Sequence, residues 1–377
     1  MNRRIFLKKG MVTAGLLLGP VPLLPSCARN LRSELMVASP MPGGSTLSRE
    51  AWQILHHASL APSGHNTQPW VVEIVSETEW IIGSDAKRWL KVVDNTNREV
   101  LLSLGTFIEN LVQAAAATGF HAQVDVVARD RFDTRIARVN LSRMAPADIP
   151  LNRLASRRTV KTNLLARELK LADVTAFSRA TKGNLYYFPR GTRHCDLMEK
   201  EAIDNFKLQF DNQKAMEEAA IWTRLSDTEA RKFRDGLTTD GMEINGISGW
   251  VVRHFMDKKD VTGTTFREKG IEKTMKQAGE GAGWLVITSD GTSVKDLIEC
   301  GRRFQRMALL AREKMIAIHP MTQALEEKHG QKNIRENHKP EMMPQFILRV
   351  GYLEKYPDPV SLRRPVDWFL ARSGTFL

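Results

Sequence analysis

The stretch 59–70, SLAPSGHNTQPW, gathers more turn-forming and hydrogen-bonding residues than a simple connection needs. Pro62 stops the helical pattern before it, and Pro69 keeps a helix from resuming before the apolar run that follows. Backbone N–H groups of such a loop stay unpaired unless a partner meets them. Polar side chains add donors and acceptors at Ser63, Asn66 and Gln68. The strip suits the polar edge of a planar heterocycle, and a stiff capped loop without a ligand is the equally weighted alternative.

Length and composition describe an ordinary globular protein with enough apolar material for a large core. The chain has 377 residues, of which 42 % are hydrophobic and 26 % charged. This length suits two domains, or one large unit with an internal duplication. The net charge is +12, but the basic residues are scattered and no nucleic-acid-binding module is visible, so nucleic acid is not an expected partner.

The N-terminus has the pattern of an export signal over residues 1–27. A basic start is followed by an apolar stretch and small residues, with prolines that argue against a membrane span. The pair Arg3–Arg4 followed by Ile-Phe-Leu-Lys resembles a twin-arginine signal, and a general secretory signal is the alternative. The resemblance implies the twin-arginine export machinery as a partner and a periplasmic or cell-envelope location. Residues 28–45, rich in proline and glycine, are expected to be a linker.

The cysteines and histidines give weaker indications. Leu-Pro-Ser-Cys27 resembles a lipoprotein cleavage box, which would place a lipid anchor on Cys27, and cleavage nearby without a lipid is equally expected. Cys195 and Cys300 are too few for a disulfide framework, and a single bridge between them stays open. Three histidines lie within ten residues without a carboxylate that would complete a metal triad, so no metal is expected; they are His56, His57 and His65.

Hydrophobic periodicity predicts alternating helices and strands. In the first half we expect helices over 47–60 and 98–118 and strands over 70–75, 123–128 and 137–142. In the second half we expect helices within 193–210, 214–236 and 294–318, strands at 185–188, 283–288 and 344–352, and a glycine- and threonine-rich region over 237–283. The two longest helices share a glycine followed three residues later by an apolar residue, at Gly105 and Gly301. This echo is a weak sign of duplication.

The stretch APSGHNTQPW resembles the Pro-Ser-x-x-Asn-x-Gln-Pro-Trp motif of the nitroreductase superfamily. In that superfamily this stretch contacts FMN at a dimer interface, and a basic strip and a basic pair of the other protomer complete the site. RRTVK fits the strip with Arg157, Thr159 and Lys161, and SLRRP fits the pair with Arg363 and Arg364. The resemblance implies FMN-binding residues at Pro62, Ser63, Gly64, Asn66, Gln68, Arg157, Thr159, Lys161, Arg363 and Arg364.

Because one site can be assembled and not two, the chain resembles the Acg-like branch of FMN-binding oxidoreductases. That branch implies an α+β fold in which two nitroreductase-like halves, here 46–150 and 151–377, form an internal pseudo-dimer with mixed sheets flanked by helices. The implied reaction is a ping-pong, two-electron reduction of a small nitroaromatic or quinone-like acceptor through flavin N5. No side chain need act as a nucleophile, so no catalytic acid or base is named. A protein that binds or stores flavin without NAD(P)H turnover is the alternative.

Overall fold

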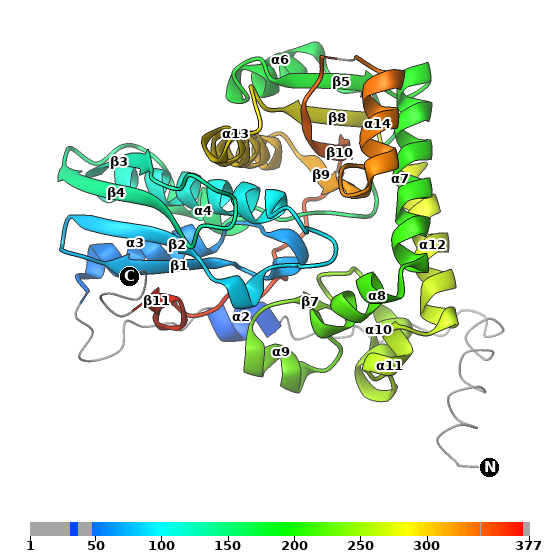
Figure 1. The fold of residues 1–377 in the computed structure, drawn as a ribbon, viewed down its shortest axis with the longest axis horizontal. Coiled ribbons are helices and arrows are strands. Elements are labelled where there is room, and N and C mark those ends of the chain that lie inside the picture. The colour runs from blue at the N-terminus through cyan, green and yellow to red at the C-terminus, as the bar shows by residue number, and fades with distance from the viewer. Residues whose placement is uncertain (1–30, 37–46, 340, 372–377) are drawn as a thin grey trace.

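The computed structural model describes residues 31–36, 47–339 and 341–371. The expected export signal at 1–27, with Cys27, lies outside these described residues. Two β-sheets with helices around and between them make up the described part, and the fold is α+β as expected (Figure 1).

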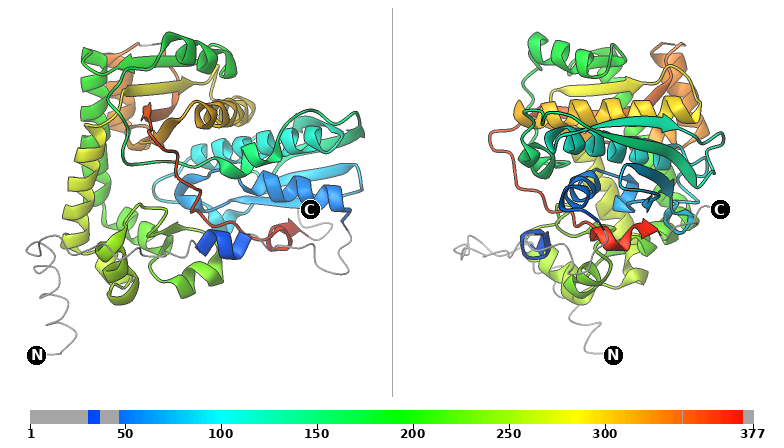
Figure 2. Two further views of the ribbon diagram at one scale, coloured as in Figure 1. Left: turned by 180° about the vertical axis from the view of Figure 1, so that it is seen from behind. Right: turned by 90° about the vertical axis from the view of Figure 1, so that its left-hand side faces the viewer.

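The first sheet has the strand order β11-β1-β2-β4-β3. Its strands are β1 (Trp70–Ile74), β2 (Glu79–Ser84), β3 (Phe120–Val126), β4 (Arg135–Arg143) and β11 (Leu370–Ala371). Neighbours are antiparallel except β11, which lies parallel to β1 with Val72 opposite Leu370. The sheet is therefore mixed, and its edge strand comes from the far end of the chain. The segment between β10 and β11 crosses from the second sheet to the first (Figure 2).

The second sheet is antiparallel throughout, in the order β5-β8-β10-β9. Its strands are β5 (Leu185–Pro189), β8 (Gly283–Thr288), β9 (Ile316–Pro320) and β10 (Pro344–Tyr352). A further two-stranded pair joins β6 (Thr223–Arg224) to β7 (Leu237–Thr238).

Two long helices, α4 (Arg98–Ala117) and α13 (Val294–Glu313), pack against each other between the two sheets (Figures 1 and 2). The two helices approach most closely at Gly105 and Gly301, the glycines that occupy similar positions in their sequences. A Cβ atom on Gly105 would lie 2.2 Å from the Ile298 carbonyl oxygen, and one on Gly301 would lie 2.1 Å from that of Leu102. Real Cβ atoms do not come this close to backbone, so the crossing requires glycine on both helices.

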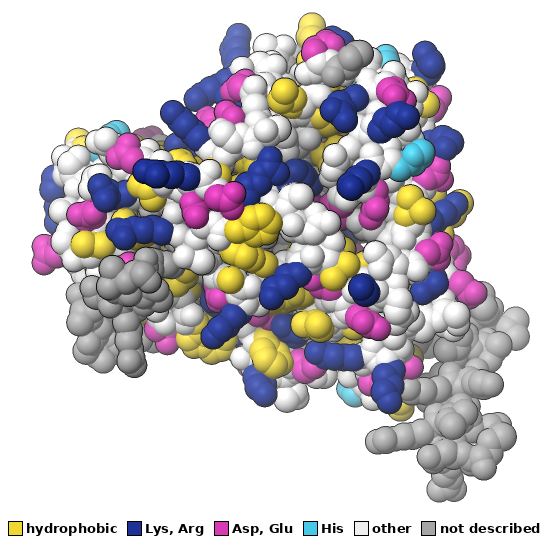
Figure 3. Space-filling model, viewed as in Figure 1, with side chains coloured by type: hydrophobic (Ala, Val, Ile, Leu, Met, Phe, Trp, Pro, Cys, Tyr) yellow, Lys and Arg dark blue, Asp and Glu magenta, His cyan; other side chains and the backbone are white. Residues whose placement is uncertain are grey.

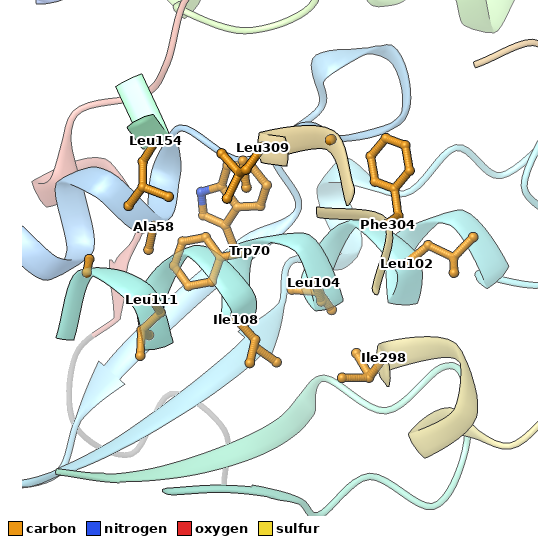
Figure 4. Close-up of a cluster of buried hydrophobic side chains, with 14 of the residues drawn as sticks. Ala58, Trp70, Leu102, Leu104, Ile108, Leu111, Leu154, Ile298, Phe304 and Leu309 are labelled. Atoms are coloured by element: carbon orange, nitrogen blue, oxygen red, sulfur yellow. The ribbon is translucent and has the colours of Figure 1, made fainter. Parts of the chain in front are cut away.

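Apolar side chains of both helices fill the space around this crossing. Figure 4 shows Leu104, Ile108 and Leu111 of α4 near Trp70 of β1, with Ile298 and Leu309 of α13 in the same cluster. These residues belong to one continuous buried cluster that reaches both sheets. Helix α4 is long and apolar enough to span a membrane by composition, but most of it is buried in this core.

The other helices surround the sheets and form a projecting arm. They are α3 (Arg49–Ser59), α5 (Leu151–Ser156), α6 (Leu171–Ala180), α7 (Arg193–Asp211), α8 (Gln213–Ile221), α9 (Asp227–Phe233), α10 (Gly246–Phe255), α11 (Lys258–Val261), α12 (Thr264–Ala278) and α14 (Lys328–Asn337). Single 3-10 turns lie at η1 (Gly64–Asn66), η2 (Ala86–Arg88), η3 (Gln323–Leu325) and η4 (Val366–Trp368). Helices α7 and α12 run side by side from the second sheet toward α8–α11 (Figure 1). The region 237–283 is thus largely helical.

Two expected helices end earlier than the sequence pattern predicts. The helix expected over 214–236 is broken after Ile221, and a new helix starts where Ser226 accepts a hydrogen bond from the Glu229 N–H at 3.2 Å. The helix expected over 294–318 ends at Glu313, because Met315 has a positive φ of 57° and residues 316–320 form β9. The hydrophobic pattern of a short buried apolar run is the same in a strand and in a helix, so periodicity alone could not locate the end of this helix.

The expected linker also contains structure. Residues 31–36 form helix α2 (Leu31–Met36), whose Leu31 packs with Ala230 and Leu362. Cys195 and Cys300 are both buried free thiols, in α7 and α13 respectively.

Candidate functional site

A cavity of about 470 Å³ lies where the loop 62–66, the first turns of α4, the segment 157–161, helix α12 and the segment 359–363 come together. This volume falls in the range of sites for small ligands and cofactors. On the face of the molecule shown in Figure 3, Lys and Arg side chains are interspersed with acidic and hydrophobic ones. The residues that line the cavity include six Lys or Arg side chains and two Glu side chains.

Eight of the ten residues expected to bind FMN line this cavity. They are Pro62, Ser63, Gly64, Asn66, Arg157, Thr159, Lys161 and Arg363. The segments that carry them are separated by up to about three hundred positions in the sequence, so the fold brings the motif and both basic elements together. Gln68 and Arg364 are not among the lining residues.

The loop 62–66 is held in an unusual conformation by its own polar groups. His65, Asn66 and Gln68 all have positive φ, between 46° and 54°. Ser63 Oγ accepts from the Gln68 N–H at 2.9 Å, and the Asn66 amide donates to the carbonyl oxygens of Gly236 (3.1 Å) and Leu362 (3.2 Å). Much of the hydrogen-bonding capacity that the sequence offers to a ligand therefore fixes the loop.

Gln68 and Arg364 form a buried clamp between the C-terminal segment and β1. The side-chain carbonyl oxygen of Gln68 accepts a hydrogen bond from the backbone N–H of Arg364 at 2.8 Å. Arg364 Nη2 donates to the backbone oxygens of Gln68 and Trp70, both at 2.7 Å. Burial lowers the pKa of Arg364 to about 9. The role that the structure gives this pair is to hold the C-terminal segment against the first sheet.

Arg157 and Arg363 make one end of the cavity strongly positive. Their side chains are deeply buried, with residue exposures of 7 % and 3 %. Arg363 donates through its terminal nitrogens to Asn66 Oδ1 (2.9 Å) and to the Leu60 carbonyl (3.1 Å). The Nε atoms of both Arg157 and Arg363 have no hydrogen-bond partner among the residues that the structure describes. Burial lowers the pKa of Arg157 to about 10, and burial together with the charges of Arg32 and Arg157 lowers that of Arg363. A buried cation with an unmet donor is the arrangement expected where an anion binds.

Lys161 and Lys273 supply a second positive region. Both line the cavity, and burial lowers the pKa of Lys161 to about 8 although the nearby Glu243 raises it. Glu243 accepts from the Lys161 backbone N–H at 3.1 Å and from Arg158 Nη2 at 3.0 Å. Glu243 therefore fixes the backbone of the 157–161 segment and leaves the Lys161 side chain facing the cavity.

Three features of the cavity could not be found from the sequence motifs. Arg32 of α2 lines its positive end, although it lies in the segment expected to be a linker. Apolar side chains from α7, α8, α12, α13 and β10 form much of the wall, namely Phe206, Phe210, Met216, Phe266, Phe304 and Phe346. In sequence these are ordinary members of apolar helix and strand patterns, so no signal separates them from core residues.

The third feature is a pair of carboxyl groups, Glu99 at the start of α4 and Glu326 after η3. The Thr322 hydroxyl reaches both, at 3.2 Å from Glu99 Oε1 and 3.4 Å from Glu326 Oε1. Burial, followed by the neighbouring Glu99, raises the pKa of Glu326 well above its ordinary value. The pair lies directly beside the loop 62–66, because a Cβ atom on Gly64 would be only 3.0 Å from Glu99 Oε2. Burial and the neighbouring carboxyl group therefore favour the protonated form of Glu326 inside the cavity.

We expect Glu326→Gln to make the protein more stable at neutral and alkaline pH, with no such gain in acid. The folded state binds the Glu326 proton more tightly than the unfolded state, so the wild type loses stability as the pH rises from the ordinary pKa of glutamate toward the raised one. A neutral amide does not lose a proton, and its N–H₂ can donate to Glu99. Thermal unfolding at pH 4, 6 and 8 should show a difference between variant and wild type that grows with pH. The exposed Glu336→Gln is the control, and a pH-independent difference for Glu326→Gln would contradict the raised pKa of Glu326.

Comparison with known proteins finds similarity to proteins named as nitroreductases. No family model matches the chain. A protein named "Putative NAD(P)H nitroreductase" from Mycobacterium tuberculosis is 24 % identical over 331 residues, which cover 84 % of this chain and 90 % of the relative. "Probable NAD(P)H nitroreductase PigM" from Serratia sp. is 22 % identical over 337 residues, covering 81 % and 89 %.

Among solved structures, a nitroreductase-like family protein from Bacillus cereus aligns with 60 % of this chain and 96 % of its own, at 13 % identity and a TM-score of 0.31. The comparison rests on the sequence relatives, because about nine-tenths of each relative aligns with this chain. The chain is therefore similar, at low sequence identity, to proteins named as nitroreductases.

Proposed function

We propose that this protein is an FMN-binding oxidoreductase of the nitroreductase type, which reduces a small nitroaromatic or quinone-like acceptor by two electrons. The observation that carries the proposal is the buried Arg157, whose Nε lacks a partner among the described residues and which lines the same cavity as the loop 62–66. A guanidinium with an unmet Nε donor at 7 % residue exposure is costly unless an anion meets it. The phosphate of FMN is such an anion.

The residues present fit this cofactor. Arg157 and Arg363 offer forked donors to a phosphate that carries nearly two negative charges. Lys161, at the second positive region, would face the pyrimidine edge of the ring system and stabilise negative charge there. The aromatic side chains of α7 and α12 give the cavity an apolar wall suited to a planar acceptor.

When bound, FMN would supply hydride transfer at its N5 atom. The chain itself would bind the phosphate, hold the ring against the loop 62–66 and exclude water with its apolar wall. The same cavity contains Glu326, whose raised pKa favours its protonated form. The expected export signal is compatible with this proposal, because the twin-arginine route carries folded proteins that already contain their cofactor.

The test is a visible spectrum of the protein without residues 1–27, before and after addition of FMN, and then with NADH or NADPH in the absence of oxygen. A flavin band that bleaches with the nucleotide supports the reductase. A bound flavin that resists both nucleotides, but is reduced by dithionite, favours the storage alternative or a different electron donor. No binding of added FMN would refute the proposal.

A further inference from the structure

Helix α2 is attached to the outside of the cavity by several contacts of different kinds. Leu31 is buried against Ala230 and Leu362. The Glu34 carboxylate accepts hydrogen bonds from both terminal nitrogens of Arg231, with 2.9 Å between Arg231 Nη2 and Glu34 Oε2. These partners belong to α9 and to the C-terminal segment. The helix therefore bridges two elements that are themselves far apart in the sequence.

The docked helix places Arg32 at the positive end of the cavity. Arg32 Nη1 donates to the Ser361 carbonyl oxygen, and the residue lines the cavity together with Arg157 and Arg363. The positive charge of Arg32 acts on Arg363, and that of Arg157 acts on Arg32, so the three guanidinium groups are close enough to repel one another. Three like charges brought together in a buried place destabilise the empty site, and this cost is offset when an anion binds among them.

This inference rests on the proposed function. We propose that α2 acts as a clamp, in that it holds Arg32 against the cofactor, and that Arg32 is the third guanidinium that binds the FMN phosphate. The evidence is the shared cavity lining of the three arginines, the unmet Nε of Arg157 and the docking of α2 through Leu31 and Glu34. Helix α2, within the segment expected to be a linker, is then part of the binding site.

The clamp predicts a specific dependence on the phosphate group. Riboflavin has the same ring and ribityl chain as FMN and lacks only the phosphate. We expect the wild type to bind FMN more tightly than riboflavin, and Arg32→Ala to lower FMN affinity about tenfold to a hundredfold, since a hydrogen bond between charged groups contributes about 1.5–3 kcal/mol. Riboflavin affinity should stay unchanged. Quenching of flavin fluorescence in titrations of the apoprotein measures both.

Leu31→Gln tests the docking separately, because it loosens α2 without removing a charge from the cavity. We expect it to reduce the preference for FMN over riboflavin in the same direction as Arg32→Ala. The exposed Arg335→Ala, on α14, is the control for loss of one positive charge. Inorganic phosphate should raise the unfolding temperature of the wild type more than that of Arg32→Ala.

The outcomes separate the clamp from the proposed function. If the wild type binds neither flavin, the proposed function fails, and a phosphate effect that depends on Arg32 would then assign the site to a free phosphate. If the wild type prefers FMN but Arg32→Ala leaves that preference intact, the clamp is refuted and the proposed function stands. An equal loss of FMN and riboflavin affinity in Arg32→Ala would also refute the clamp, since it would show a general disturbance of the cavity.

Discussion

Replacing Arg157 by methionine should lower the affinity for FMN by about two orders of magnitude and leave the apoprotein equally stable or more stable. Arg157 is buried with an unpartnered Nε beside two other guanidinium groups, so its charge is a cost in the empty protein. In the complex the same charge meets the phosphate, and truncating one side of a buried charge pair costs about 2–5 kcal/mol of binding. Methionine keeps similar volume without the charge. Binding and stability should therefore change in opposite directions.

The measurement pairs an FMN titration with thermal unfolding of the apoprotein. Arg364→Met is the matched control, because the sequence motif assigns both arginines to the cofactor whereas the structure gives Arg364 three bonds to Gln68 and Trp70. The Nη2 bonds are lost in that variant and leave buried carbonyl groups unpaired, so we expect clear destabilisation. Equal destabilisation by both substitutions would show that Arg157 is a structural residue and would remove the main support for the phosphate site.

Replacing Gly301 by alanine should destabilise the fold by more than about 3 kcal/mol, above the usual cost of overpacking. In an exposed helix the same change is favourable by about 1 kcal/mol. Here the new Cβ would lie 2.1 Å from the Leu102 carbonyl oxygen and 3.0 Å from the Gly105 Cα, both of them backbone atoms that a side-chain rotation cannot move. Relief requires α4 and α13 to separate, and that separation opens the core on both sides.

Urea unfolding of wild type and variant measures this difference. Gly279→Ala is the control, since Gly279 has an ordinary φ of −76° and a Cβ there would meet its nearest atoms at 3.6–3.7 Å. That variant should be close to wild type. If Gly301→Ala were as stable as the control, the close crossing of α4 and α13 would be wrong.

Much of the fold follows from periodic patterns in the chain. Helix α4 and strands β1 and β10 were expected within one or two residues of their observed ends, because each carries a long, regular apolar face. The ends of α8 and α13 were missed, since their limits depend on tertiary partners. Residues 316–318 become a strand only because β10 is there to pair with them.

In the candidate site, too, some residues could be predicted from the sequence and others could not. The loop 62–66 and the segment 157–161 carry a recognisable motif, and both line the cavity. Arg32 has no motif, and its place depends on Leu31 packing onto α9 and the C-terminal segment. Gln68 and Arg364 match the motif but are directed into contacts within the protein, which a one-dimensional pattern does not distinguish from contacts with a ligand.

The lining of the cavity extends along the chain from Arg32 to Arg363, and β11 completes the first sheet only with residues 370 and 371. During synthesis on the ribosome, the positive end of the cavity thus lacks Arg363 until more than three hundred residues after Arg32 have been added. A ligand that needs both arginines can then be captured only after the segment with Arg363 has emerged and folded back onto the first sheet. Occupancy of the cavity would report that these two distant segments have come together.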